Sequence, residues 1–296
     1  MTIVATIITY NRLSLLQECI AAVKKQSRPV DRIIVINNAS TDGTTEWLAE
    51  QSGLTVICQE NKGGTWGFNT GLKNAYEAGA DWVWVMDDDT IPYEDTLEKL
   101  VKAIEMNNDP MPGFYGSKVV WKDGSEHLMN IQEIDYSDAD KLQHMQLNHM
   151  KPVRYNSFVS ILVSRNAVEK AGLPIKEFFI WCDDIEFTRR IIDAGYSGTL
   201  VENSLVLHKT PENYKVDIFI DKPANIWKYK YGLRNELYIR KHHKSNSSFW
   251  RNILKRLFVW PFLILFRRKN ARWTFIKTVW RSTISAVSFN PTIEHI

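Results

Sequence analysis

The stretch Trp82-Val83-Trp84-Val85-Met86-Asp87-Asp88-Asp89-Thr90 decides the fold, because a short apolar run ends abruptly in three carboxylates. Such a run, followed by Pro92, predicts a buried strand that carries its acids to the edge of a sheet. If the chain stays extended, Asp87 and Asp89 lie on one side and Asp88 on the other. Two carboxylates about 7 Å apart suit a hard divalent cation, which would in turn bind a diphosphate. A solvated acidic turn is the alternative.

Strand and helix patterns alternate around this stretch. Apolar, β-branched runs predict buried strands at Thr2–Ile8, Arg32–Ile36 and Thr55–Cys58. Helical patterns separate them, and Ser14 followed by Gln17 is typical of a capping box that opens the first helix. This alternation implies right-handed crossovers and a mostly parallel, Rossmann-like sheet with flanking helices.

Three polar loops follow strands of this predicted sheet, at Thr9–Arg12, Asn37–Asp42 and Asp87–Thr90. Ligands of such sheets bind beyond the carboxyl ends of the strands. The three loops therefore predict one crevice that binds a nucleotide. A glycine-rich run at Asn61–Asn69 opens a helix, but the GxGxxG pattern of dinucleotide-binding folds is absent.

The middle of the chain continues the α/β pattern and then departs from it. Further elements are expected as a helix at Tyr93–Met106, strands at Phe114–Trp121 and Phe158–Val163, and a helix at Asn166–Ala171 that Gly172 ends. Between them, Lys122–Lys151 has no regular period. We interpret this segment as a long excursion on the acceptor side of the site.

The second informative stretch is Phe178-Phe179-Ile180-Trp181-Cys182-Asp183-Asp184-Ile185-Glu186-Phe187, in which aromatic residues precede two acids. The acids open a predicted helix that Gly195 ends. Acids at a helix N-terminus cap it and complement its dipole, which is the simpler role for Asp183. Asp184 lies one residue further in, beside aromatic residues that limit its solvation, and this setting suits a general base.

A third feature is the apolar run Leu205–Leu207, which ends in His208. One histidine after a strand is more often an ordinary surface residue than a ligand. Because an acidic metal site is already predicted, His208 becomes a candidate ligand there. An imidazole in the site shifts preference toward Mn²⁺ over Ca²⁺.

Composition sets broad limits on the protein. The 296 residues are enough for one large α/β domain and an appendage, and 44% of them are apolar. Cys19, Cys58 and Cys182 follow neither a disulfide pattern nor a zinc pattern, which indicates a reducing compartment. The chain opens directly on a strand-like run with no basic-then-apolar leader, so we expect a cytoplasmic location. The oligomeric state is left open.

The net charge of +3 conceals a division of the chain. Up to Glu236 there are 25 basic and 33 acidic residues, whereas 12 basic residues and 1 acid follow. The body is therefore about −8 and the C-terminal region about +11. This asymmetry predicts a catalytic domain at 1–222 and a helical region at 223–296 with an anionic partner of its own.

The C-terminal region interleaves Lys and Arg with large aromatic residues between 250 and 289. Its longest apolar run, Leu257–Phe266, is interrupted by Pro261 and is too short to span a bilayer. Basic, aromatic amphipathic segments lie in the interface of anionic membranes, and the density of Trp and Leu favours lipid over nucleic acid. We expect peripheral association with the inner face of the cell membrane. Packing on the body or oligomer formation is the alternative.

Taken together, these motifs resemble the inverting glycosyltransferases of family 2, which have the GT-A fold. The resemblance covers roughly residues 2–240, and the galactofuranosyltransferases and rhamnosyltransferases of bacteria are the most similar groups. It depends on the order of seven motifs along the chain, namely ITYNR, NNASTDGT, NKGGTWGFNTGL, VMDDDT, FFIWCDDIEF, VLHK and YKYGLRN. An ordered set of this kind is far more specific than any one motif.

The resemblance implies roles for the acids and the histidine. Asp87 and Asp89 match ligands of Mn²⁺ or Mg²⁺, with His208 as the third protein ligand. Asp184 matches the catalytic base, and Asp183, together with Trp181, lies close to the acceptor. The positions that match the nucleotide-sugar site are Thr9, Asn11, Arg12, Asn37, Gly63, Gly64, Trp66, Asn69, Asp88 and Arg234. The family usually has Asp where Asn37 stands, which weakens any inference about the base.

These roles agree with the chemistry of glycosyl transfer. A dication neutralises the departing nucleoside diphosphate, and a carboxylate takes the proton of the attacking hydroxyl, so one displacement inverts the anomeric carbon. The resemblance implies UDP-galactofuranose as donor and a lipid-linked glycan of a bacterial surface polysaccharide as acceptor. Alternatives are a rhamnosyltransferase of the same fold, a nucleotidyltransferase, or a non-catalytic glycan-binding module.

Overall fold

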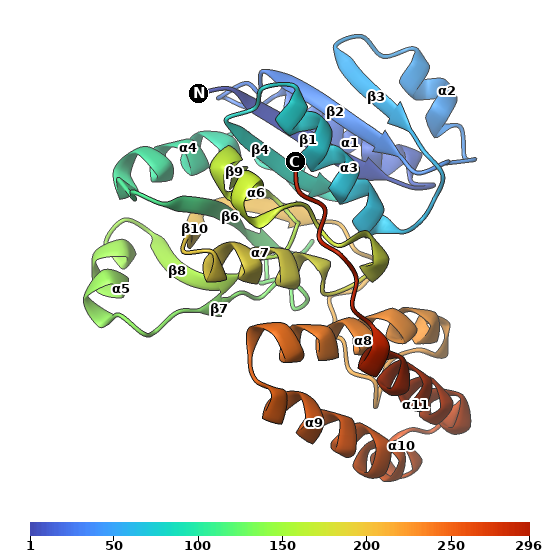
Figure 1. Cartoon of the computed structure of the whole chain (residues 1–296). Helices are drawn as coiled ribbons and strands as arrows, with labels where there is room; N and C mark the ends of the chain where they lie inside the picture. Colours follow the sequence, from blue (N-terminus) through green and yellow to red (C-terminus); the bar gives the residue numbers. More distant parts are fainter.

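The computed structural model describes residues 1–296 and shows a central sheet covered by helices, with four C-terminal helices grouped beside this body (Figure 1). Ten strands form the sheet, in the order β3-β2-β1-β4-β9-β6-β10-β8-β7, and β5 pairs with β10. The strands are β1 (Ile3–Thr9), β2 (Arg32–Asn37), β3 (Leu54–Cys58), β4 (Trp82–Asp87), β5 (Thr90–Pro92), β6 (Pro112–Val120), β7 (Glu133–Ile134), β8 (Met150–Tyr155), β9 (Ile161–Ser164) and β10 (Ser197–His208).

The sheet is parallel in its first half and mixed in its second. Strands β3, β2, β1 and β4 all run parallel, as the alternating pattern predicts. β6 and β10 are also parallel, but β9 lies antiparallel between β4 and β6, and β8 and β5 run antiparallel to β10. A crossover helix would return the chain to the opposite end of the sheet, so that the next strand is parallel. The excursion after β6 does not do this, and β8 is therefore antiparallel to β10.

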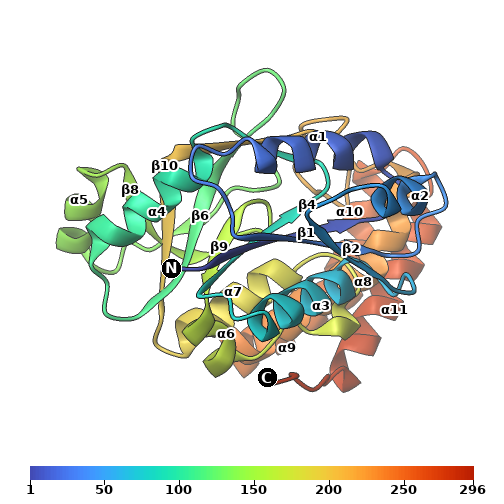
Figure 2. The ribbon, with the colours of Figure 1, turned by 90° about the horizontal axis from the view of Figure 1, so that it is seen from above.

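Helices cover both faces of the sheet (Figure 2). On one face, Leu16 of α1 and Leu100 of α4 pack with Trp84. On the other, Leu72 of α3 and Phe187 of α7 share a core with the opposite side of the same strands. The helices are α1 (Leu13–Lys24), α2 (Thr44–Ala49), α3 (Gly64–Glu77), α4 (Thr96–Asn107), α5 (Ala139–Gln146), α6 (Arg165–Ala171), α7 (Asp183–Asp193), α8 (Ile226–His243), α9 (Asn246–Leu254), α10 (Trp260–Arg267) and α11 (Arg272–Ser288).

Some boundaries differ from those predicted. Ser14 does not cap α1, and instead Asp42 Oδ2 from the next loop accepts a hydrogen bond from the Leu13 backbone N–H at 3.0 Å. This long-range cap replaces the local capping box because the β2–α2 loop lies beside the start of α1. The excursion at 122–151 contains β7 and α5, and its last residues begin β8.

The C-terminal helices form a unit with its own core. Tyr229 and Leu233 of α8 pack against Phe275 and Val279 of α11. Arg256, 1% exposed, donates to the Leu233 carbonyl at 2.6 Å and pairs with Glu236 of α8. None of the helices of the chain combines the length and the apolar character that crossing a bilayer requires.

The end of the chain returns to the body. The Leu173 backbone N–H donates to the Glu294 carbonyl at 2.8 Å, and the Glu294 carboxylate pairs with Lys73 of α3 at 3.0 Å. Part of the C-terminal region thus packs on the body, which the sequence left open as the alternative to membrane association. The basic, aromatic helices α9 and α10 lie on the far side of the unit (Figure 1).

Candidate active site

The acidic corner lies where β4 ends beside β1. Asp87 is the last residue of β4, and the chain then turns, with the Asp88 backbone N–H donating to the Ile8 carbonyl at 3.1 Å. Thr9 Oγ1 donates to Asp88 Oδ2 at 2.8 Å. The extension therefore stops at Asp87, and the predicted alternation of the three acids does not hold beyond it.

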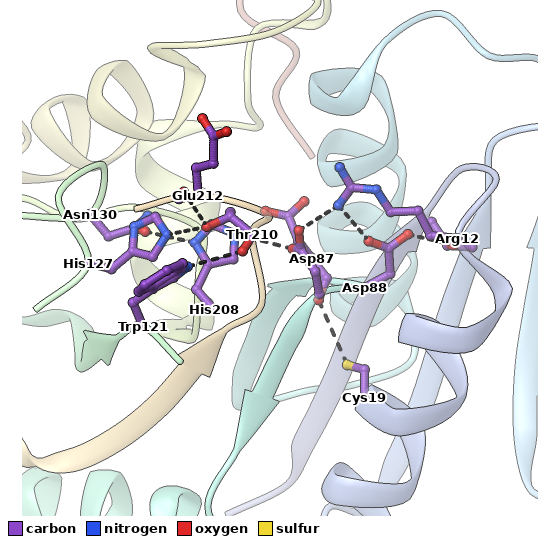
Figure 3. Close-up of polar contacts among 12 residues, drawn as sticks. Arg12, Cys19, Asp87, Asp88, Trp121, His127, Asn130, His208, Thr210 and Glu212 are labelled. Atoms are coloured by element: carbon purple, nitrogen blue, oxygen red, sulfur yellow. Dashed lines mark hydrogen bonds and ion pairs between the residues drawn. The ribbon is translucent and has the colours of Figure 1, made fainter. Parts of the chain in front are cut away.

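Arg12 contacts the second and third acids, and its contact with Asp88 is drawn in Figure 3. Its Nη1 donates to Asp88 Oδ1 at 3.3 Å and to Asp89 Oδ2 at 2.6 Å. The prediction that Asp88 points away from Asp89 is wrong, since one guanidinium contacts both. Arg12 follows β1, which confirms that the loops after β1 and β4 meet at one edge of the sheet.

Burial and the charges of neighbouring residues shift the pKa values of all three acids in this corner. Burial, followed by the charges of Asp89 and Asp88, raises the pKa of Asp87 well above its usual range. Burial also raises the pKa of Asp88 to about 6, although Arg12 opposes it. For Asp89, burial opposes ionisation, but His208 and Arg12 outweigh it and lower the pKa to about 2. Burial and repulsion from the neighbouring acids therefore outweigh the effect of Arg12 on the pKa of Asp87.

His208 reaches this corner through strand pairing. It is the last residue of β10 and lies opposite Thr90 of β5, the residue after Asp89. Its Nε2 atom is 3.2 Å from Asp89 Oδ1, a buried oxygen that has no hydrogen-bond partner. The structure thus brings together two of the three predicted metal ligands, which are 119 positions apart in the chain.

The donor atoms of this corner fit a metal ion in part. Nowhere in the structure do three or more carboxylate, imidazole or thiol side chains converge as a ready-made cage. Asp89 and His208 nevertheless supply an oxygen and a nitrogen, and the unpartnered Asp89 Oδ1 is available to a cation. Mg²⁺ takes only one or two carboxylates from its protein and completes its shell with phosphate oxygens and water. Asp89 and His208, with Asp87 beside them, fit this kind of site.

A second acid pair lies near the acidic corner, at the start of α7. Thr65 Oγ1 of α3 donates to Asp183 Oδ2 at 2.9 Å, and the charge of Asp183 is among the causes that raise the pKa of Asp87. Asp184 is half-buried. Burial, followed by the charge of Asp183, raises the pKa of Asp184 to about 7. The helix is not side-chain capped, since its N-cap residue is Cys182.

The segment before this pair is held in a strained conformation. Phe179, Trp181 and Cys182 all have φ between 65° and 67°, which costs non-glycine residues about 1–3 kcal/mol each. Asn235 Nδ2 of α8 donates to the carbonyls of Phe178, Ile180 and Trp181 at 2.9, 3.2 and 2.9 Å. The YKYGLRN motif thus fixes the backbone that presents Asp183 and Asp184.

Two glycines make room for this segment. A Cβ atom on Gly63, whose φ is +101°, would lie 2.4 Å from the Phe179 carbonyl oxygen. On the other side, a Cβ atom on Gly232 would lie 2.7 Å from the Trp181 ring. Gly63, predicted to lie near the donor, therefore permits the close approach of the loop before α3 to the segment before α7. Gly64 meets no such constraint.

Some predicted donor-site residues stabilise the loops that follow β1 and β2. Asn11, at φ 53°, accepts the Thr41 backbone N–H at 2.7 Å through its Oδ1 atom. Asn37 is fully buried, and its amide bonds Thr45 Oγ1 and the Ser40 backbone N–H at 2.9 and 3.0 Å. Each amide atom already makes one hydrogen bond within the loop, and the match of Asn37 to the nucleotide-sugar site stays a prediction.

Three further predicted residues lie around the segment 174–179. Asn69 of α3 is buried and donates to the Pro174 carbonyl at 2.9 Å. Trp66 is half-buried between the ammonium groups of Lys62 and Lys176, 4.9 and 5.0 Å from its ring. Arg234 donates to the Glu177 carbonyl at 2.5 Å and stacks on Phe289 at 3.7 Å, and none of its contacts is with the acidic corner. Its match to the nucleotide-sugar site stays a prediction.

The structure adds residues that the motifs did not indicate. Lys228 of α8 lies over the Trp181 ring at 5.7 Å and forms no ion pair. Burial, followed by the charge of Arg12, lowers the pKa of Lys228. Two cations from opposite ends of the chain, Arg12 and Lys228, are therefore close enough to repel each other. No local signal distinguishes Lys228 from other lysines, because only the packing of α8 brings it here.

Comparisons with known proteins agree with this arrangement. A sequence model of the glycosyl transferase family 2 domain matches residues 5–171, more than half of the chain. A galactofuranosyltransferase of Mycolicibacterium smegmatis is 26% identical over 208 residues, which are 64% of this chain and 65% of that relative. The chain thus spans just under two thirds of that relative's length. An O-antigen chain rhamnosyltransferase of Salmonella typhimurium is 26% identical over 216 residues, 70% of this chain and 66% of the relative.

A solved structure supports the fold over nearly the whole chain. A mannosyltransferase of Pyrobaculum calidifontis, in complex with GDP-Man and Mn²⁺, superposes with a TM-score of 0.56 at 19% identity and covers 97% of this chain and 75% of its own. At this identity the likeness shows the fold alone. The predicted GT-A fold is confirmed.

Proposed function

Because this chain belongs to glycosyl transferase family 2, we propose that it transfers a sugar from a nucleoside-diphosphate donor to a lipid-linked glycan, using Mn²⁺ or Mg²⁺ and inverting the anomeric carbon. The observation that carries the proposal is the proximity of two acidic groups, the corner after β4 and the pair at the start of α7. Asp183 is close enough to act on the ionisation of Asp87, together with burial and the neighbouring acids.

The acidic corner and the acid pair at the start of α7 have different roles in the reaction. Asp89, His208 and Asp87 would hold the cation, which supplies charge neutralisation to the leaving diphosphate. Arg12 and Lys228 are placed to contact phosphate oxygens. Asp184 takes the proton of the acceptor hydroxyl. The hydroxyl oxygen bonds to the anomeric carbon as the bond from that carbon to the diphosphate breaks. One base and no covalent nucleophile give inversion.

We infer that UDP-galactofuranose is the first donor to test, since a galactofuranosyltransferase is among the similar proteins. The rhamnosyltransferase of Salmonella typhimurium supports a rhamnosyl donor as the second candidate. Both would place the enzyme in the synthesis of a bacterial surface polysaccharide. The choice depends on pocket contacts with individual hydroxyl and methyl groups, which sequence motifs do not report.

A donor panel tests this proposal. Purified protein with Mn²⁺ is expected to release nucleoside diphosphate from one nucleotide sugar, UDP-galactofuranose first, in preference to the others. Diphosphate and pyrophosphate are measured separately, because a nucleotidyltransferase would release pyrophosphate from a nucleoside triphosphate. No diphosphate release from any nucleotide sugar, with or without membrane extract as acceptor, would leave a glycan-binding module as the better explanation.

We also propose that helices α9 and α10 bind the anionic inner face of the cell membrane, where a lipid-linked acceptor would lie. Along them, apolar residues recur every fourth position and are exposed, namely Trp250, Leu254, Phe258, Phe262 and Phe266. A spacing of four drifts around an α-helix of 3.6 residues per turn, but the π-helical segment Lys255–Val259 widens one turn and counters this drift. Exposed Arg251, Lys255 and Arg267 supply the matching charge.

The triple substitution Phe258→Ser, Phe262→Ser and Phe266→Ser tests this surface. These side chains are 64%, 63% and 84% exposed, so the fold should be retained. Each ring, if partly buried in the membrane, contributes about 1 kcal/mol to binding. The triple variant should therefore bind vesicles of phosphatidylcholine and phosphatidylglycerol about a hundredfold more weakly, as measured by co-sedimentation. Donor turnover with a soluble acceptor should not change. Met106→Ser, an exposed apolar residue on α4, is the matched control. Equal sedimentation of wild type, the triple variant and Met106→Ser with the vesicles would refute the proposed membrane-binding surface.

A further inference from the structure

We propose that Asn130, in the polar excursion after β6, is a positioning residue that holds the His208 ring with its Nε2 atom toward Asp89. This inference rests on the proposed metal site and deepens it. It also assigns a role to a segment for which the sequence suggested only a place on the acceptor side.

The geometry places Asn130 and Asp89 on opposite edges of one imidazole. Asn130 Oδ1 is 2.9 Å from His208 Nδ1 (Figure 3), and Asp89 Oδ1 is 3.2 Å from Nε2. A carbonyl oxygen only accepts hydrogen bonds, so the Nδ1 atom carries the hydrogen in this contact. The lone pair of a neutral ring then lies on Nε2, where a cation bound to Asp89 would meet it. Histidine ligands commonly have such a partner on the other ring nitrogen, which fixes both tautomer and orientation.

The turn that carries Asn130 is itself fixed. The Asn130 backbone N–H donates to the His127 carbonyl at 3.0 Å, which closes a turn over residues 127–130. The Met129 backbone N–H donates to His127 Nδ1 at 3.4 Å, so the hydrogen of a neutral His127 is on Nε2, which bonds Thr210 Oγ1 at 2.8 Å. The His127 and His208 rings pack at 4.4 Å between centroids.

A second set of contacts ties the same turn to the chain after His208. The Leu128 backbone N–H donates to Asn213 Oδ1 at 2.8 Å, and Asn213 Nδ2 donates to the Glu126 carbonyl at 3.0 Å. Trp121 Nε1 donates to the Thr210 carbonyl at 3.1 Å. Asn130 is therefore held against His208 by contacts from both sides, independently of any ligand. The excursion forms the outer wall of the acidic corner.

The test compares Asn130→Ala and Asn130→Asp with wild type and with His208→Ala, all as full chains. Manganese affinity is measured by calorimetry with Mn²⁺ alone. The tautomer of His208 is read from long-range ¹H–¹⁵N spectra at alkaline pH with diamagnetic Mg²⁺ in place of Mn²⁺, because the metal-free Asp89 carboxylate would itself attract a hydrogen on Nε2; His208→Ala is used for assignment. We expect Asn130→Ala to weaken Mn²⁺ binding by about 10- to 100-fold and to shift the ring away from the Nδ1–H tautomer. Asn130→Asp keeps an acceptor and should restore both.

Each outcome bears on the inference. An unchanged tautomer and unchanged Mn²⁺ affinity in Asn130→Ala would overturn it, and so would loss of the tautomer in Asn130→Asp, because Asn130 would then act as a donor. Asn130→Asp alone decides the matter if the alanine variant does not fold. Asn148→Ala, in the same excursion, is the matched control. If His208→Ala binds Mn²⁺ as wild type does, the proposed metal role of His208 fails, whereas glycosyl transfer measured by diphosphate release would remain.

Discussion

Replacing Asp184 with Asn is expected to lower turnover by about 10²- to 10⁴-fold, the usual contribution of a general base, while donor binding is retained. The amide has nearly the same shape as the carboxyl group, and it can still accept from the Ile185 backbone N–H, as Asp184 Oδ1 does at 2.7 Å. It cannot take the proton of an attacking hydroxyl. The variant should therefore bind UDP with Mn²⁺ as wild type does and fail at the chemical step.

Initial rates of diphosphate release and calorimetric UDP affinity separate these two effects. Asp193→Asn, at the other end of α7, is the matched control and should retain turnover, since Asp193 is exposed and contacts only His243. Turnover within tenfold of wild type in Asp184→Asn would assign the base to another group. A parallel loss of UDP affinity would instead indicate that Asp184 supports the site.

The same carboxyl group predicts a pH dependence. Burial, followed by the charge of Asp183, raises the pKa of Asp184 to about 7, and only the ionised form is a base. The rate should therefore be low below pH 7, rise as pH passes through about 7, and level off above it. A rate that stays level from pH 5 to pH 9 is the result that would contradict a base of this pKa.

Replacing Asp89 with Ala is expected to reduce metal-dependent turnover by about a thousandfold and to abolish measurable Mn²⁺ binding. The substitution removes the oxygen that faces His208 Nε2 at 3.2 Å, and with it the strongest anionic ligand of the corner, whose pKa of about 2 keeps it ionised. A cation that stabilises a leaving diphosphate contributes several kcal/mol, which corresponds to losses of this size.

The control for Asp89→Ala is Asp95→Ala, a half-exposed acid paired with Lys99 on α4. It should not change Mn²⁺ affinity or turnover. Asp89→Ala removes the closer carboxylate partner of Arg12 and the carboxylate beside His208, so thermal unfolding must be measured beside activity. A folded Asp89→Ala enzyme with undiminished turnover in the presence of a chelator would exclude a metal role for this corner.

Local patterns predicted the elements of the first half of the sheet and the acids at its edge. Buried parallel strands are nearly continuous apolar runs, and the polar residues that end them stand out in the sequence. Hence β1, β2, β3 and β4 were predicted within one or two residues of their observed bounds. The strand at Phe114–Trp121 was also predicted to within two residues of β6, but the antiparallel directions of β8 and β9 were not, because strand direction depends on long-range pairing.

The sequence by itself determined that carboxylates end two apolar stretches, that a histidine ends a third, and that a basic, aromatic region follows an acidic body. Tertiary structure alone decided which of these side chains meet. The pairing of β5 with β10 brings His208 to Asp89, the packing of α8 brings Lys228 toward Arg12, and a turn far from any motif places Asn130 behind His208. The physical reason is that side-chain period and turn chemistry act over a few residues, whereas these contacts join positions more than 70 residues apart and depend on the packing of the whole chain.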